Sequence, residues 1–226
     1  MLVGDEQAAS ERSQWRPSHS AYRIARRQMG GCVTSSVHSG ESTLQFSKPF
    51  RRIIRRYMPH FCFGESSTDD DRLIAFSHWE HVFKETIHST ALGADSPVGR
   101  LYECFYTQLY ERAPHLKALF KGNSQTQARV LVHISTGMKS LLQSENLVQK
   151  VTELALLHMK IGVQPEDFDP LGETLIQAMK LTSRDQWSDR IELAWRRIYC
   201  HAAIMILVTI PNLHLDIRDS HNELVT

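Results

Sequence analysis

His158 is the side chain best placed to do chemistry, because it stands on the apolar side of a short segment with helical spacing. Val151, Leu154 and Leu157 share that side, and Gly162 follows as a residue suited to end a helix. An inward-facing imidazole either packs in a core with its nitrogens hydrogen-bonded or binds a transition metal through its neutral nitrogen. Periodicity leaves both uses open, so the preceding segments must decide between them.

Two earlier segments carry polar groups that can donate hydrogen bonds to a ligand. Tyr106 falls in a predicted helix that begins at Ser96 and Pro97 and is interrupted at Pro114. Gln127 heads an otherwise apolar row on the next predicted helix. A phenolic O–H and an amide N–H at the edge of an apolar pocket could both bind a polarised ligand.

At three stretches the sequence resembles the globin family, most of all single-domain bacterial globins and the haem domain of flavohaemoglobins. The stretches are FYTQLYERAPHLKALF (105–120), QTQARVL (125–131) and LALLHMKIGV (154–163), and the resemblance extends from Trp79 to Tyr199. It implies an all-α globin fold of about seven to eight helices around a haem pocket, with haem b (iron protoporphyrin IX) as the cofactor.

The resemblance assigns a role to each matching residue. His158 would bind the haem iron and leave the opposite axial position open to a gas, with Phe120 against the haem face. Tyr106 and Gln127 would donate hydrogen bonds to bound O2, and Leu131 would form an apolar wall. The full haem-contacting set is predicted to be Tyr106, Phe120, Gln127, Leu131, Leu154, His158 and Phe168, with His158 as the metal ligand.

These roles predict reversible binding of O2, and also of NO or CO, for oxygen storage and transport, sensing or redox electron transfer. Because an amide is a poor iron ligand, Gln127 should leave the haem five-coordinate. Each hydrogen bond to a charged acceptor contributes about 1.5–3 kcal/mol, so two donors should slow O2 release on the order of a hundredfold or more.

Two other functions fit the same residues. An NO dioxygenase or nitrite reductase would use Tyr106 and Gln127 to position bound oxygen. Flavohaemoglobins place a tyrosine and a glutamate beside the proximal histidine, but Phe168 and Ile210 stand at the matching positions, and no G-x-G-x-x-G motif follows. Such an enzyme would need a separate reductase, and enzyme activity stays open. A haem-free helical interaction module would use His158 only for packing.

The other histidines are not predicted to bind metal or ligand. His133 precedes His158 by 25 residues, which is too short a spacing for a distal residue. We expect His78, His81 and His115 at helix ends or on polar faces, where they would lie on the surface.

Composition divides the chain into three parts. Residues 1–68 are rich in Ser, Arg and Gly without a sustained apolar period, which predicts a disordered extension. Residues 69–210 have helical periodicity and no strand signal, so they predict the folded domain, and 211–226 form a polar tail. The last helix is predicted to start at a capping box of Ser183 and Gln186. The first helix is predicted to bury Leu73, Phe76, Trp79 and Phe83.

Charge and cysteine spacing favour a protein of the cytoplasm without a nucleic-acid partner. The net charge is +1, which gives no electrostatic reason for nucleic-acid binding. The four cysteines stand far apart, as is typical of reduced intracellular thiols. The sequence shows no apolar run long enough to cross a bilayer and no secretory signal at its start.

A lipidation motif lies within the predicted extension. MGGCVTSS (29–36) has the form of an N-myristoylation site at Gly30, with Cys32 beside it for palmitoylation. Arg51, Arg52, Arg55 and Arg56 flank two isoleucines in a basic patch (Arg51–Arg56) suited to anionic lipid. Gly30 can be acylated only if translation starts at Met29, in which case we expect peripheral attachment to the cytoplasmic face of a membrane. In the 226-residue form, a solvated arm is the alternative.

Overall fold

The computed structural model describes residues 44–83, 96–119 and 162–210, the backbone of residues 33–35, and four positions between 153 and 158. These described residues contain five α-helices joined in places by short 3-10 turns, so the predicted all-α class is confirmed. The helices are α3 (Lys48–Tyr57), α4 (Asp69–Phe83), α5 (Pro97–Arg112), α8 (Phe168–Ser183) and α9 (Asp189–Leu207), and the turns are η2 (Pro59–Phe61), η4 (Pro114–Ala118), η5 (Pro165–Asp167) and η6 (Arg184–Gln186).

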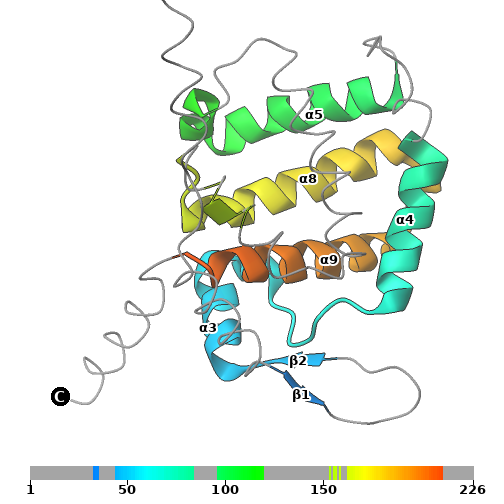
Figure 1. The fold of residues 1–226 in the computed structure, drawn as a ribbon. Coiled ribbons are helices and arrows are strands. Elements are labelled where there is room, and N and C mark those ends of the chain that lie inside the picture. Colours follow the sequence, from blue (N-terminus) through cyan, green and yellow to red (C-terminus); the bar gives the residue numbers. More distant parts are fainter. Residues whose placement is uncertain are drawn as a thin grey trace, which may run out of the picture.

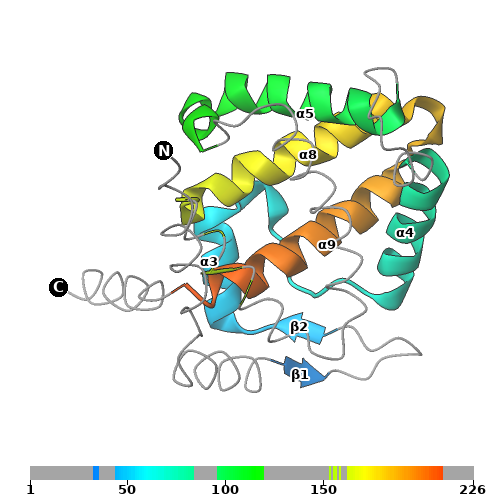
Figure 2. The ribbon, with the colours of Figure 1, turned by 45° about the horizontal axis from the view of Figure 1, so that its top comes forward.

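Three long helices form the body of the described structure. Figure 1 shows α5, α8 and α9 one below another, and the turned view in Figure 2 keeps this order. Helix α5 packs mainly on α8, while α4 crosses one end of the stack and packs on α9. Helix α3 lies at the opposite end, against α9. The core therefore sits between α8 and its neighbours on both sides.

Helix ends follow local chemistry at several predicted positions. The Ser96 hydroxyl accepts a hydrogen bond from the backbone N–H of Gly99 and caps α5, which has a proline in its first turn. Gly162 adopts a left-handed φ of 88°, as expected after a helix end. The capping box at Ser183 is wrong, because α9 is capped by Ser188, whose hydroxyl accepts from the N–H of Ile191.

The predicted buried stripe of α4 is partly wrong. Leu73 is 65% exposed, and its place on the buried face is taken by Asp71, Ala75 and His78. Phe83 is fully buried as expected. The helix is rotated so that Asp71 pairs with Arg197 of α9 and His78 meets Ser183 of α8 and Trp195 of α9. These polar contacts occupy the buried face of α4 and leave Leu73 exposed.

Helix α3 corrects the predicted boundary of the folded domain. The sequence predicts a disordered extension to residue 68, and this is wrong for residues 44–68. Phe50, Ile53, Ile54 and Tyr57 recur at three- and four-residue steps and are all buried in the main core. The four arginines of the helix lie on the other side, so the basic composition conceals an amphipathic helix.

A short antiparallel strand pair precedes α3. Strands β1 (Val33–Ser35) and β2 (Leu44–Phe46) pair with Val33 opposite Phe46. The sequence predicts no strand, because three-residue strands carry little periodic signal and depend on tertiary support. That support comes from Phe46, whose ring packs edge-on against His201 of α9 at 5.8 Å between ring centroids.

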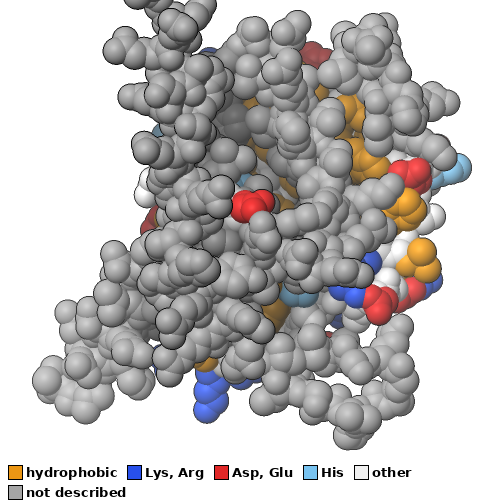
Figure 3. All heavy atoms as spheres, in the orientation of Figure 1, with side chains coloured by type: hydrophobic (Ala, Val, Ile, Leu, Met, Phe, Trp, Pro, Cys, Tyr) orange, Lys and Arg blue, Asp and Glu red, His pale blue; other side chains and the backbone are white. Residues whose placement is uncertain are grey.

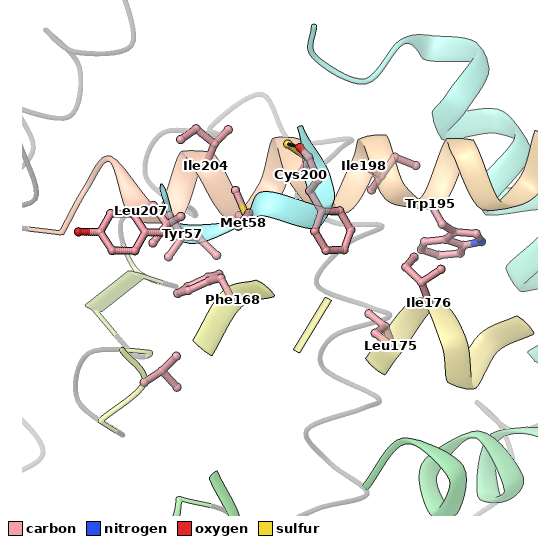
Figure 4. Packing of buried hydrophobic residues seen from close by; sticks show 14 of the residues in the cluster. Tyr57, Met58, Phe168, Leu175, Ile176, Trp195, Ile198, Cys200, Ile204 and Leu207 are labelled. Atoms are coloured by element: carbon pink, nitrogen blue, oxygen red, sulfur yellow. Dashed lines mark hydrogen bonds between the residues drawn. The ribbon is translucent and has the colours of Figure 1, made fainter. Parts of the chain in front are cut away.

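The turn after α3 inserts Phe61 between α8 and α9. Its ring is fully buried and lies 4.9 Å from the Tyr199 ring, and its carbonyl accepts a hydrogen bond from the Cys200 thiol. Gly172 provides the space, because a Cβ there would lie 2.3 Å from Tyr199 Cε1. Figure 4 shows the same core nearby, with Tyr57 close to α9 side chains and to Phe168. Residues before the predicted boundary thus complete the core.

Candidate haem site

His158 lies at the end of its helical segment, next to an aromatic ring from α8. Its ring centroid is 5.9 Å from that of Phe168, with 31° between the ring planes. The backbone N–H of Val163 donates to the His158 carbonyl at 3.1 Å, which closes the segment at the left-handed Gly162. The imidazole is half-buried.

Both the ring and the backbone of Phe168 are held by contacts within the fold. Its ring is buried, and its carbonyl accepts a hydrogen bond from the Tyr199 hydroxyl at 2.6 Å. Burial raises the pKa of Tyr199 far above its usual value, so this hydroxyl stays protonated and remains a donor. The ring beside His158 therefore has one defined position.

The turn between His158 and α8 is held by a buried carboxylate. Asp167 accepts from the backbone N–H of Gln164 at 2.8 Å and pairs with His115 of η4 at 2.7 Å. Leu119, at the end of η4, contacts Gly162 closely enough that an added Cβ would lie 3.3 Å from its Cδ2. Leu119 therefore lies beside the turn that follows His158.

Tyr106 supplies a buried hydroxyl on α5. It is 4% exposed and belongs to a row of tyrosine rings, 4.9 Å from Tyr102 and 5.6 Å from Tyr110 between ring centroids. Burial, and then the neighbouring Tyr110 and Tyr102, raise the pKa of Tyr106 well above its usual value. The hydroxyl is therefore a neutral donor throughout the physiological pH range.

The donor set fits an iron held in a macrocycle. Among the residues that the structure describes, no three His, Cys, Asp or Glu side chains converge on one point where they could hold a bare metal ion. His158 is a single imidazole beside the apolar ring of Phe168, which suits a flat apolar cofactor that brings four metal ligands of its own. We therefore find the residues compatible with haem.

Of the predicted site residues, the structure brings His158 and Phe168 together and buries Tyr106. The remaining ones, Phe120, Gln127, Leu131 and Leu154, lie outside the described residues. Sequence reasoning missed the contributions of Asp167 and Tyr199 to the geometry beside His158. Gln164 and Asp167 form a capping box, a spacing that the sequence could have revealed, whereas the Tyr199 contact crosses 31 residues and leaves no local signal.

One predicted surface histidine is in fact buried. His81 and His115 are exposed as expected, but His78 is only 5% exposed. Its Nδ1 accepts from the Trp195 indole N–H at 3.1 Å, and its Nε2 lies 3.0 Å from the Ser183 hydroxyl. His78 therefore belongs to a structural network that joins α4 to α8 and α9.

Comparison with known proteins identifies the family that this part of the sequence matches. A family model described as Globin matches residues 104–206, which include Tyr106, His158 and Phe168. The chain therefore carries a globin domain over these residues. This globin is 29% identical over 105 residues to a leghemoglobin of Psophocarpus tetragonolobus, covering 42% of this chain and 72% of that protein.

Other relatives are flavohemoproteins, which are longer. Flavohemoprotein B of Dictyostelium discoideum is 27% identical over 100 residues, covering 42% of this globin and 23% of that protein. A flavohemoprotein of Vibrio cholerae is 25% identical over 141 residues, covering 61% of this globin and 35% of the relative. This globin thus matches only 23% and 24% of the length of the first flavohemoproteins compared. Among its described helices, none is long and apolar enough to cross a membrane.

Proposed function

We propose that this haem-binding globin holds haem b through His158 and binds O2 reversibly, with NO and CO as further ligands. The proposal is supported chiefly by the contact between the half-buried His158 imidazole and the ring of Phe168, whose carbonyl is hydrogen-bonded to Tyr199. Bound haem would supply an iron that can bind a diatomic gas. Storage, sensing and redox electron transfer would all use that one property.

The chain's own groups would set the polarity around the ligand. Tyr106 offers a hydroxyl that stays protonated because burial raises its pKa, and Gln127 is the proposed second donor. Donors in an apolar site stabilise a ligand that carries partial negative charge more than a neutral one. O2 should therefore be retained more strongly, relative to CO, than in a pocket without these donors.

Phe168 and Ile210 stand at the two positions where flavohaemoglobins carry the tyrosine and glutamate that raise electron donation by the proximal histidine. Phe168 has no hydroxyl, and the nearby Tyr199 hydroxyl is already donated to a backbone carbonyl. Ile210 is apolar and half-buried. A strongly donating histidine favours oxygen chemistry over simple binding, so these substitutions favour reversible ligand binding.

A second candidate is NO dioxygenase or nitrite reductase activity with electrons from a separate reductase. It is favoured by similarity to several proteins named flavohemoproteins, of which this globin covers only a part. NO consumption measured with and without an added reductase distinguishes the two. Turnover that requires the reductase supports the enzyme, and unchanged slow consumption supports the binding protein.

Absorption spectra test the proposal. The purified chain should show a Soret band that shifts with dithionite and again with CO, and His158→Ala should lose or shift that band. His81→Ala, which removes an exposed histidine from α4, is the matched control and should leave the spectrum unchanged. A wild-type chain that takes up no haem would favour the haem-free interaction module instead.

A further inference from the structure

The outer face of α3 carries a row of positive charge. Lys48, Arg51, Arg52, Arg55 and Arg56 recur at helical spacing on the side opposite the buried residues, and the helix contains no acidic residue. All but Arg51 are exposed, and Arg51 is half-buried. We call these five residues the α3 basic face.

Several other surface cations of the described structure form ion pairs with carboxylates, whereas the described residues provide no such partner for the α3 basic face. Beside α4, Arg190 pairs with Asp70 and Arg197 with Asp71. Figure 3 shows the contrast, with blue and red atoms mixed beside α4 and blue atoms alone projecting at the lower edge, below the place of α3 in Figure 1. Within the described residues, no carboxylate forms an ion pair with the α3 basic face.

Packing fixes how such a helix could meet a partner. A helix that inserts into a bilayer needs a free apolar face, but Ile53 and Ile54 are 0% and 1% exposed in the globin core. The helix therefore cannot turn its isoleucines outward without unfolding the core. Contact through this face would be electrostatic and would keep the protein folded.

The strand pair relates this face to the lipidation motif. Val33 follows Cys32 in the chain and pairs with Phe46, which is only two residues before Lys48. The strand Val33–Ser35, which is part of the motif, thus lies beside the strand that leads into α3, although Val33 and Lys48 are 15 positions apart in the sequence. Part of the lipidation motif and the start of the basic helix are therefore neighbours in the fold, and this favours a lipid surface over an acidic protein as the partner.

We propose that the α3 basic face docks the folded globin on an anionic phospholipid surface without inserting into it. Polybasic segments gain about 1 kcal/mol per cation near such a surface, which corresponds to about fivefold in partition for each cation. Loss of three cations should therefore weaken binding on the order of a hundredfold. The contact should also weaken with salt, since the Debye length is only about 10 Å at 0.1 M.

Sedimentation with vesicles tests the face without any acyl group, because the full chain starting at Met1 leaves Gly30 internal. Wild type should bind phosphatidylcholine vesicles that contain phosphatidylserine and not those of phosphatidylcholine alone. The variant Arg52→Gln/Arg55→Gln/Arg56→Gln should lose binding on the order of a hundredfold, while replacing the same three by lysine should retain it. Raising the salt should release the wild type.

A control variant removes the same charge elsewhere. Arg112, Lys117 and Arg184 are exposed and lie outside α3, so changing all three to Gln should leave vesicle binding nearly unchanged. Equal loss in both variants would show a net-charge effect and overturn the proposal. Absence of wild-type binding to the anionic vesicles would also overturn it and favour an acidic protein partner. If the α3 triple variant lost its helical circular dichroism, the single changes at Arg52 and Arg55 would decide, each expected to cost about fivefold.

Discussion

Acid should destabilise this globin through His78, which is neutral and buried between tryptophan rings. The indole N–H of Trp195 can only donate, so the Nδ1 that it meets must be the acceptor and the proton must sit on Nε2, facing the Ser183 hydroxyl. If Nδ1 of His78 were protonated, its N–H would face the indole N–H of Trp195, so that two hydrogen-bond donors would lie 3.1 Å apart without an acceptor. Burial, and then the nearby His81, lower the pKa of His78 from 6.5 to about 4.

The sign and size of the effect follow from that pKa. Between pH 6.5 and about 4 the unfolded chain binds a proton at this residue that the folded chain does not. The free energy of unfolding should therefore be fully retained above pH 6.5 and fall as the pH is lowered through this window. One pKa unit corresponds to about 1.4 kcal/mol, so the loss from His78 by pH 4 is about 3 kcal/mol.

Urea unfolding followed by circular dichroism at several pH values measures the effect. In His78→Gln the amide can still accept from Trp195 but cannot take up a proton. The free energy of unfolding of the variant should depend less steeply on pH than that of wild type, by up to about 1.4 kcal/mol per pH unit. The control His81→Gln changes an exposed histidine on the same helix and should keep most of the slope. Parallel pH profiles for wild type and His78→Gln would refute the assignment of His78 as the acid-sensitive group.

Three further predictions concern packing, ligand binding and capping. Gly172→Ala should cost about 1–3 kcal/mol in urea unfolding, because its Cβ would meet the ring of Tyr199; an unchanged midpoint would contradict this close fit. Tyr106→Phe should speed O2 release about tenfold or more in stopped-flow measurements, with a much smaller effect on CO; equal effects on both gases would argue against a donor role. Ser188→Ala should cost about 1 kcal/mol by removing the cap on the N–H of Ile191, and a thermal melt identical to that of wild type would show that the cap contributes nothing.

The sequence predicted features whose causes are local. Ser96 and the residue before Pro114 bound α5 as expected, because capping and the missing proline N–H act within a few residues. Gly162 adopts the left-handed conformation that its position after His158 predicts. His158 and Phe168 could be assigned together only through the family resemblance, since nothing in the spacing of ten residues requires their rings to meet.

Features that depend on distant partners were missed. His78 seemed a surface residue because it is polar, but Trp195 and Ser183, more than 100 residues away, satisfy both of its nitrogens. Helix α3 was assigned to the extension because its arginines dominate the composition, although Ile53 and Ile54 are spaced for a buried face. In both cases the average polarity of the segment did not indicate which face of the helix would be buried by the rest of the fold.

The insertion of Phe61 between α8 and α9 also constrains the order of events during synthesis. Its carbonyl meets the Cys200 thiol, 139 residues later in the chain, and the N–H of His60 meets Asp169 across 109 residues. At ribosomal rates of about 5–20 residues per second, the apolar face of α3 would wait roughly 7–30 s for α9 to emerge. The part of the described fold that is made first is thus the last to be packed, and until then its apolar face remains exposed.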